Sequence, residues 1–326
     1  MERLLSIVVP LYNEEDSIKE LYAEIRDNCA KSVSNGVING WELFFVSDGS
    51  ADGSERLIKD LIEKRNKSKC DTPDRGGAVH LIAFRKNFGK AAALQAGFKH
   101  ANGDIVITMD ADLQDDPAEI ENFIRKIDEG WDLVSGWKYN RLDPLEKRLP
   151  SKLFNKVTSS LSGVKLHDFN CGFKAYRKEV VKSIDLYGEM HRYIPVLANR
   201  KGFRITEIKV HHRKREHGKS KYGMERYLRG LFDSMTTSFL SRFYDRPMYF
   251  FGKLGLLLFF AGFAICGYLT VLKIMGQTIG GRPMLALGVL CIVLGIQSFT
   301  TGFIGDMIVD STFHNRYTES HIKEII

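Results

Sequence analysis

The chain has 326 residues, enough for one large domain or two smaller ones, and its formal net charge is +7. This basic balance favours an anionic partner, such as nucleotide phosphates, an acidic membrane surface or nucleic acid, without choosing among them. The five cysteines are scattered without a CxxC pair, so the sequence supports neither a disulfide framework nor a zinc site.

Short apolar runs alternate with amphipathic segments from residue 4 to about residue 136. The runs predict strands and the segments between them predict helices, a pattern typical of an α/β fold with a mostly parallel sheet and helices on both faces. The predicted strands are residues 4–9, 43–47, 79–84, 105–109 and 133–135, and the predicted helices are residues 15–30, 54–64, 90–100 and 117–128. The first run contains Pro10 and lacks a cleavage-like region, so it predicts a buried strand rather than a secretory signal.

The pattern becomes irregular and strongly basic between residues 137 and 222. Long irregular stretches in a compact domain are usually functional, so we expect this region to carry donor and acceptor contacts.

Two apolar runs, residues 250–272 and 284–308, dominate the last quarter of the chain. Each has about the twenty residues needed to cross a bilayer and exceeds the usual length of a buried core helix. Arginines cluster before the first run, at Arg226, Arg229, Arg242 and Arg246. The positive-inside rule therefore places the N-terminal domain and both termini in the cytoplasm, at the inner or plasma membrane.

This patterning predicts three parts: a cytoplasmic domain at 1–223, a juxtamembrane segment at 224–247 and a two-helix membrane domain at 248–326. Arginines alternate with apolar residues between 224 and 244. That pattern suits either an amphipathic helix in the membrane interface or an ordinary helix packed on the domain.

Two carboxylates, Asp110 and Asp112, follow the predicted strand 105–109. Open α/β sheets bind ligands at the carboxyl ends of their strands. Alternate carboxylates on an extended segment can face one hard cation, and Mg²⁺ is typically held by one or two carboxylates plus substrate phosphates. The alternative is that the acids cap the helix near Pro117, but Asp115 and Asp116 suit that role better.

The first two predicted strands also end in acids, Glu14 and Asp48. A carboxylate such as Asp48 can accept from a base N–H or a ribose hydroxyl, and Gly49 allows close approach of the backbone. Ser47-Asp48-Gly49-Ser50 alone would indicate only a turn, but its combination with the other two acidic strand ends indicates a nucleotide site. No Gly-x-Gly-x-x-Gly follows the first strand, so a metal is expected to neutralise the diphosphate.

Six motifs resemble those of family 2 glycosyltransferases of the GT-A fold, in the polyprenyl-phosphate group that includes dolichyl-phosphate mannose synthase. The two apolar runs are similar to those of the membrane-anchored bacterial branch, whose acceptor is undecaprenyl phosphate. The motifs are Val8-Val9-Pro10-Leu11-Tyr12-Asn13-Glu14, Ser47-Asp48-Gly49-Ser50, Arg85-Lys86-Asn87-Phe88-Gly89-Lys90, Asp110-Ala111-Asp112-Leu113-Gln114, Asp168-Phe169-Asn170-Cys171-Gly172-Phe173-Lys174 and His217-Gly218-Lys219-Ser220-Lys221-Tyr222.

The resemblance implies a role for each matching residue. The nucleotide sugar would be bound by Pro10, Tyr12, Glu14 and Asp48, with Lys221 and Arg213 on its diphosphate. Mg²⁺ or Mn²⁺ would be held by Asp110, Asp112 and Gln114, and the catalytic residues would be Asp110, Asp112 and Asp168. The acceptor phosphate would meet a subset of Lys138, Arg141, Lys147, Arg148 and Ser151. Some relatives carry an acid where this chain has Gly172, which leaves Asp168 open as either an orienting residue or a loop cap.

The implied reaction moves a sugar from a UDP- or GDP-linked donor to the phosphate of a polyprenyl phosphate, with inversion. A phosphate monoester has a second pKa of about 6, so it is a nucleophile at neutral pH without a strong base. The implied partners are the nucleotide sugar, polyprenyl phosphate, the lipid bilayer and further copies of the chain as a homo-oligomer.

Three other functions are weaker alternatives. A family 2 transferase that extends a lipid-linked or exported polysaccharide would need more spans than two. A membrane-anchored binding or transporter subunit would need an ion pathway, and the spans lack an intramembrane charge pair. Nucleic-acid binding through residues 209–221 is disfavoured because few aromatic residues interleave with the basic ones.

Overall fold

The computed structural model describes residues 3–68, 77–139, 155, 159, 163–186, 190–211, 213, 243, 246–279 and 283–313. The chain divides into two compact units, Met1–Met235 and Thr236–Ile326. The three-part division expected from the sequence stays a prediction, and residues 214–242, which carry most of the predicted juxtamembrane segment, lie outside the described ranges.

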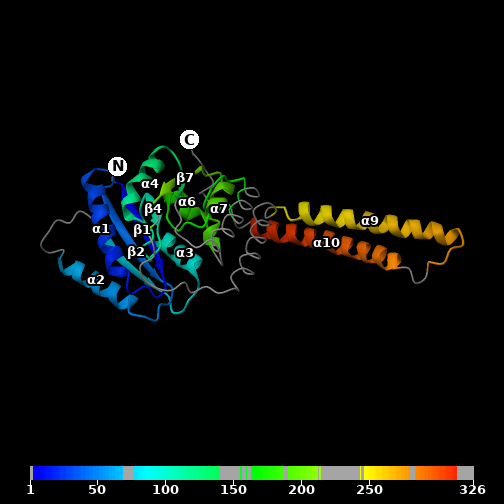
Figure 1. Ribbon diagram of the computed structural model, residues 1–326, viewed down its shortest axis with the longest axis horizontal. Coiled ribbons are helices and arrows are strands. Elements are labelled where there is room, and N and C mark those ends of the chain that lie inside the picture. The colour runs from blue at the N-terminus through cyan, green and yellow to red at the C-terminus, as the bar shows by residue number, and fades with distance from the viewer. Residues whose placement is uncertain are drawn as a thin grey trace. The chain divides into compact units, whose positions relative to one another are not determined.

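One mixed sheet with flanking helices forms the first unit (Figure 1). Its strands are β1 Leu4–Leu11, β2 Gly40–Ser47, β3 Ala78–Ala83, β4 Ile105–Thr108, β5 Leu133–Lys138, β6 Lys174–Arg177 and β7 Ile205–Val210. Its helices are α1 Ile18–Ser34, α2 Ser54–Ser68, α3 Lys90–His100, α4 Ile120–Asp128, α6 Lys178–Ser183 and α7 Ile194–Arg200, with 3₁₀ turns η1 Pro117–Glu119 and η2 Met190–Arg192.

The strand order is β3-β2-β1-β4-β6-β5-β7. The pairs β1–β2, β1–β4, β2–β3 and β5–β7 are parallel, whereas β6 is antiparallel to both of its neighbours, β4 and β5. Every strand except β6 therefore runs in the same direction. The carboxyl ends of β1, β2, β4, β5 and β7 consequently meet at one edge of the sheet, where ligands of open α/β sheets bind.

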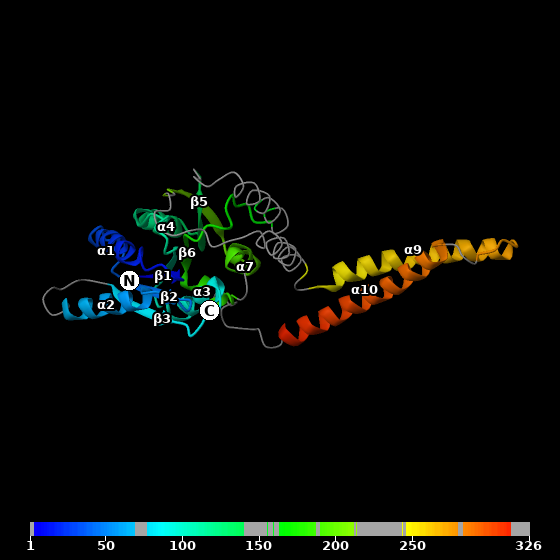
Figure 2. The same ribbon diagram turned by 60° about the horizontal axis from the view of Figure 1, so that its bottom comes forward.

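Alternate side chains along the strands pack into two cores on opposite faces of the sheet. Ile7 and Phe45 belong to the core that α1, α2 and α4 cover, and Val8 and Phe44 belong to the core that α3, α6 and α7 cover. Figure 2 shows α4 and α3 on opposite sides of β1. Each fully buried aliphatic or aromatic side chain contributes about 1.5–3 kcal/mol, so the long apolar strands stabilise the edge that carries the loops.

The expectation of an α/β fold with helices on both faces is confirmed, but the expected irregularity of residues 137–222 is wrong for its described part. That part contains β6, α6, α7 and β7. β6 is only four residues long and begins with the buried Lys174, so it lacks an apolar run. In β7, a strand at the edge of the sheet, two polar residues separate Ile205 from Ile208, so the strand lacks both an apolar run and a regular alternation.

The second unit is a pair of antiparallel helices, α9 Met248–Ile274 and α10 Pro283–Phe313 (Figure 1). A Cβ atom on Gly255 would lie 2.7 Å from the carbonyl oxygen of Gly295, and one on Gly262 would lie 2.6 Å from that of Gly288. Small residues at these crossing points let the two backbones pack closely. Both helices are long and apolar enough to cross a membrane, and they contain the predicted runs 250–272 and 284–308.

Candidate active site

Two loops at the carboxyl ends of β1 and β2 are joined by hydrogen bonds. The side chain of Asn13 accepts from the backbone N–H of Ala51 at 2.8 Å, and its own N–H donates to the Ser50 hydroxyl at 3.1 Å. Asn13 has a positive φ of 54°, a conformation that asparagine tolerates better than most residues. The predicted nucleotide residues on the first loop differ in exposure, since Pro10 is buried within β1 and Tyr12 is 40% exposed.

Asp48, predicted to bind the nucleotide, is buried and holds the loop before α3. One carboxylate oxygen accepts from the N–H of Phe88 at 2.7 Å, and the other accepts from Gly89 at 2.9 Å. The next residue, Gly49, has a φ of +70°, and a Cβ there would lie 2.5 Å from the Lys86 carbonyl carbon. The Asp48 carboxylate therefore fixes the position at which α3 begins.

The first residue of α3, Lys90, forms an ion pair with Asp110 at the end of β4. Burial by itself would raise the pKa of Asp110, but the charges of Lys90 and Lys138 lower it to about 2. Burial opposes the charge of Lys90, yet the Asp110 carboxylate raises the pKa of that ammonium. Asp110 is therefore ionised across the physiological pH range, with its charge already balanced.

The loop after Asp110 is tightly turned. Leu113 has a φ of +61°, and Asp112 accepts from the N–H of Gln114 at 3.3 Å. Asp112 and Gln114 are both partly exposed at this edge. Within the described ranges, no group of three or more His, Cys, Asp or Glu side chains is placed to hold a metal ion. A cation at Asp112 would thus need further oxygen ligands, and diphosphate oxygens are of the right kind.

Asp115 is 1% exposed and links this loop to the next strand. One of its oxygens accepts from the N–H of Asp110 at 3.1 Å, and the other lies 3.1 Å from the ammonium of Lys138. Burial opposes the charge of Lys138, but the Asp115 carboxylate raises the pKa of that lysine. Lys138, predicted to meet the acceptor phosphate, is thus paired inside the protein.

Arg213, predicted to contact the donor diphosphate, is also paired with carboxylates. Its guanidinium donates to both oxygens of Glu24 at 2.7 and 2.8 Å and to Asp116 at 2.9 Å. Its backbone N–H donates to the carbonyl oxygen of Gln114 at 3.0 Å, so this residue joins the segment after β7 to the candidate metal loop. The remaining predicted phosphate contacts, Arg141, Lys147, Arg148, Ser151 and Lys221, lie outside the described residues.

Asp168 is 1% exposed and lies at the start of a tight loop. Its side chain accepts from the N–H of Asn170 at 3.0 Å, which is the geometry of a loop cap. The buried Lys174 closes the same loop by donating to the carbonyl oxygens of Phe169, at 3.3 Å, and Cys171. This hydrogen bond is of the kind that a loop cap makes, and the role of Asp168 in the reaction stays a prediction.

Gly172, where some relatives have an acid, lies directly against Asp110. A Cβ there would be 2.5 Å from a carboxylate oxygen of Asp110, and the Gly172 carbonyl accepts from the Thr108 hydroxyl at 2.7 Å. The loop that Asp168 caps therefore forms one wall of the Asp110 site. Because Gly172 has no side chain, the Asp110 carboxylate can occupy the space that a Cβ atom would fill.

Lys90 and Lys174 both lie in motifs that are recognisable in the sequence, but the motifs implied no role for either residue. Two features of the sequence could have drawn attention to them. Lys90 follows Gly89 at the start of a helix, and Lys174 is the first residue of a strand. Neither signal identifies a partner, because Asp110 lies twenty residues after Lys90 in the chain.

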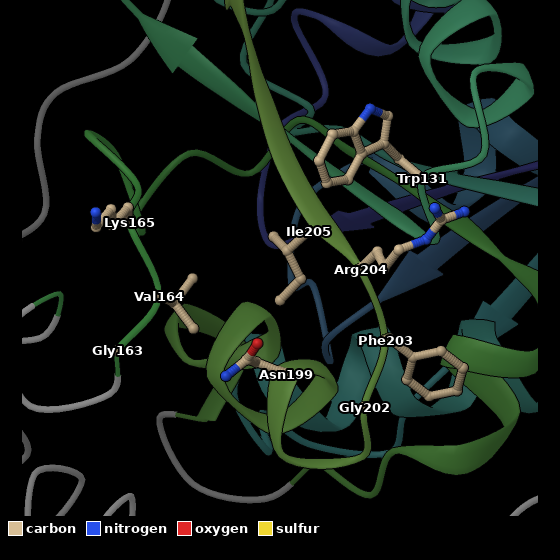
Figure 3. A pocket seen from close by; sticks show the side chains of 9 residues that line it. All are labelled: Trp131, Gly163, Val164, Lys165, Asn199, Gly202, Phe203, Arg204 and Ile205. Atoms are coloured by element: carbon tan, nitrogen blue, oxygen red, sulfur yellow. The ribbon is translucent and has the colours of Figure 1, made fainter.

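A separate pocket lies at the opposite edge of the sheet (Figure 3). Trp131 lies two residues before the first residue of β5 and Arg204 directly precedes β7, so the pocket is at the amino ends of these strands. It does not belong to the site around Asp110. Its lining residues are Trp131, Gly163, Val164, Lys165, Asn199, Gly202, Phe203, Arg204 and Ile205.

Comparison with known sequences identifies the family. The model of Glycosyl transferase family 2 matches residues 6–185. Dodecaprenyl-phosphate galacturonate synthase from Rhizobium johnstonii is 38% identical over 98% of this chain and 91% of its own. Undecaprenyl-phosphate 4-deoxy-4-formamido-L-arabinose transferase from Pseudomonas paraeruginosa is 34% identical over 94% of this chain and 85% of its own.

Comparison with solved structures supports the fold. Glucosyl-3-phosphoglycerate synthase from Mycobacterium tuberculosis, solved with Mn²⁺, UDP and phosphoglyceric acid, matches with a TM-score of 0.50 and 18% identity. The match covers 74% of this chain and 78% of that structure. The GT-A-type fold expected from the sequence motifs is confirmed. With its mostly parallel sheet and its matched residues, this chain is a member of glycosyl transferase family 2.

Proposed function

We propose that this protein transfers a sugar from a nucleotide diphosphate to the phosphate of a membrane polyprenyl phosphate. The observation that carries the proposal is the extent of the match to two polyprenyl-phosphate sugar enzymes, which spans 98% and 94% of this chain. Both matches are long enough to include the two apolar helices. A lipid acceptor also accounts for the two apolar helices, because the phosphate of such an acceptor lies at the surface of the bilayer.

A divalent metal, Mg²⁺ or Mn²⁺, fits the residues at the end of β4. Asp112 and Gln114 would hold it, with Asp110 beside them, and it would neutralise the charge that develops on the leaving diphosphate. The carboxylate and amide oxygens are suitable ligands for these hard cations. The Mn²⁺ in the M. tuberculosis structure supports this assignment through the shared fold.

The protein's own contribution to the reaction is positioning and charge. The acceptor phosphate oxygen would attack the anomeric carbon of the sugar as the bond to the diphosphate breaks, which inverts that centre. Because the phosphate is already ionised, no side chain has to remove a proton from it. The buried, loop-capping position of Asp168 agrees with a mechanism that has no general base. Lys90, at the start of α3, pairs with Asp110 and so holds that carboxylate beside the metal loop.

A product assay tests the proposal. Detergent-purified protein would be incubated with Mg²⁺ or Mn²⁺, a short-chain polyprenyl phosphate and labelled UDP- and GDP-sugars. We expect an organic-soluble sugar phosphoprenol that disappears when EDTA is added. Folded protein that makes no lipid product from any donor would contradict the lipid acceptor. Product formation that persists in EDTA would contradict the metal.

Lys90→Met is expected to lower kcat/KM for the nucleotide sugar about 10- to 100-fold, the value of one charge-assisted hydrogen bond. Asp110 would lose its counter-ion, while the stem of the side chain would keep its packing. Lys90→Arg retains the charge and should recover part of the activity. Steady-state kinetics with varied donor concentration measure the effect, and unchanged donor kinetics in Lys90→Met would contradict this role.

For the membrane placement, we propose that the first unit lies on the cytoplasmic side and that the protein forms homo-oligomers. The arginine cluster before α9 supports the orientation through the positive-inside rule. The resemblance to the two-span branch of the family supports the homo-oligomer, whereas the glycines on α9 and α10 pack these two helices against each other within one chain.

A further inference from the structure

Four side chains gather at the carboxyl ends of β5 and β7, outside the site around Asp110. We name this group, Trp137, Tyr139, His167 and Lys209, the Trp137 cluster. Trp137 and Lys209 are directly paired across the two parallel strands. The indole of Trp137 is stacked on the His167 ring, with 4.0 Å between centroids and 10° between planes, and Tyr139 meets it edge-on at 5.1 Å.

Lys209 is held by aromatic rings. Its ammonium lies 4.5 Å from the centroid of the Tyr139 ring and 5.5 Å from that of Trp137. Among the described residues, no carboxylate lies within 4.0 Å of it, whereas Lys90, Lys138 and Arg213 are each paired with an acid. Cation–π contacts orient an ammonium without cancelling its charge. Lys209 therefore retains its charge for an external anion.

His167 is fixed by Glu207, two residues before Lys209 on β7. The backbone N–H of His167 donates to one oxygen of Glu207 at 2.8 Å, and its Nδ1 faces the other oxygen. The Glu207 side chain is only 15% exposed, whereas that of His167 is 64% exposed. A carboxylate on one ring nitrogen sets the orientation of the imidazole. The second nitrogen, Nε2, is thereby held in a defined direction on an exposed ring.

The Trp137 cluster shares an edge with the Asp110 site. β5 and β7 run in the same direction as β4, because β6 lies between β4 and β5 and is antiparallel to both. Lys138, next to Trp137, is paired with Asp115, which accepts from the backbone of Asp110.

We propose that the Trp137 cluster binds the phosphate end of the acceptor lipid, a phosphate monoester on an unsaturated apolar chain. Lys209 and His167 supply the cationic and hydrogen-bonding groups that a phosphate requires. The exposed face of Tyr139, which is 57% accessible, and the indole of Trp137 supply apolar surface for the first units of the chain. This inference rests on the proposed function, but it assigns residues that the sequence motifs did not.

A binding experiment tests the cluster without turnover. Full-length protein in detergent is titrated with farnesyl phosphate in the absence of nucleotide sugar, and binding is followed by intrinsic fluorescence, because Trp137 lies in the cluster. We expect Lys209→Met to weaken binding about tenfold or more, the loss of one hydrogen bond to a charged group. Lys209→Arg should bind nearly as well as the wild type. The control Lys31→Met, an exposed lysine near the end of α1, should change nothing.

The ligand comparison separates the possible sources of the phosphate. Phosphatidic acid carries the same monoester on a diacylglycerol, and inorganic phosphate has no chain. Farnesyl phosphate binding that exceeds both supports the assignment. Equal binding of phosphatidic acid or of inorganic phosphate overturns it, as does wild-type affinity in Lys209→Met. The proposed function is tested separately by the product assay, so a protein that binds farnesyl phosphate but makes no lipid product would refute the function and not the cluster.

Discussion

Asp112→Asn is expected to abolish sugar transfer, with kcat/KM reduced about 10³-fold. Asp112 is a partly exposed carboxylate on this loop, so it is placed to contribute charge to a divalent cation. An asparagine keeps the shape and can still accept from the N–H of Gln114, so the loop should stay folded. Steady-state kinetics at saturating Mn²⁺, together with Mn²⁺ binding measured by electron paramagnetic resonance, would check both consequences.

Asp168→Asn is the matched comparison for Asp112→Asn. Asp168 is buried and caps its loop, so its replacement should slow turnover by about tenfold or less and leave Mn²⁺ affinity unchanged. Near-normal activity of purified Asp112→Asn in the presence of metal would contradict the assignment of the metal to this loop. A larger loss in Asp168→Asn than in Asp112→Asn would contradict the loop-cap role.

Lys138→Met is expected to destabilise the protein by about 3–5 kcal/mol, because it leaves the Asp115 carboxylate buried without its partner. The two side chains are 12% and 1% exposed, so water cannot replace the lost ammonium. Thermal or denaturant unfolding of the detergent-solubilised protein measures the change. The double variant Asp115→Asn/Lys138→Met should recover part of the loss, because it removes the unpaired charge.

A surface ion pair provides the control for Lys138→Met. Lys126 is paired with Glu129 at 2.6 Å, but the two side chains are 35% and 52% exposed. Lys126→Met should therefore cost about 1 kcal/mol or less. If Lys138→Met instead left stability unchanged and raised only the KM for the acceptor, the phosphate contact expected from the sequence would be correct and the structural role wrong.

The strands were predictable from the sequence where their apolar runs are continuous. β1, β2 and β4 are fully buried or nearly so, and most of their residues are apolar, although β1 contains Ser6 and β2 contains Glu42. β6 and β7 were missed because their stability comes from neighbours. Lys174 is accommodated in β6 by carbonyl oxygens of the preceding loop, and β7 is held at the edge by its pairing with β5. Local periodicity carries no information about such contacts.

The partners of the charged residues were not predictable either. Arg213 and Glu24 are 189 residues apart in the chain, yet their side chains meet at 2.7 Å. From the sequence alone, every lysine and arginine of a basic segment is an equal candidate to bind a phosphate. The structure distinguishes Lys138 and Arg213, which are paired with carboxylates, from Lys209, which is held by aromatic rings.

The fold class, the family, the two apolar helices and the edge of the sheet that carries the acidic motifs were all predictable from the sequence. These properties follow from apolar periodicity, from the length of apolar runs and from motifs at strand ends, all of which are local along the chain. The pairing of particular acids with particular bases, the hydrogen bond from Asn170 to Asp168 and the meeting of Trp137, His167 and Lys209 depend on the tertiary structure. Ion pairing and ring stacking act over a few ångströms in space, so they depend on how the strands are ordered in the sheet.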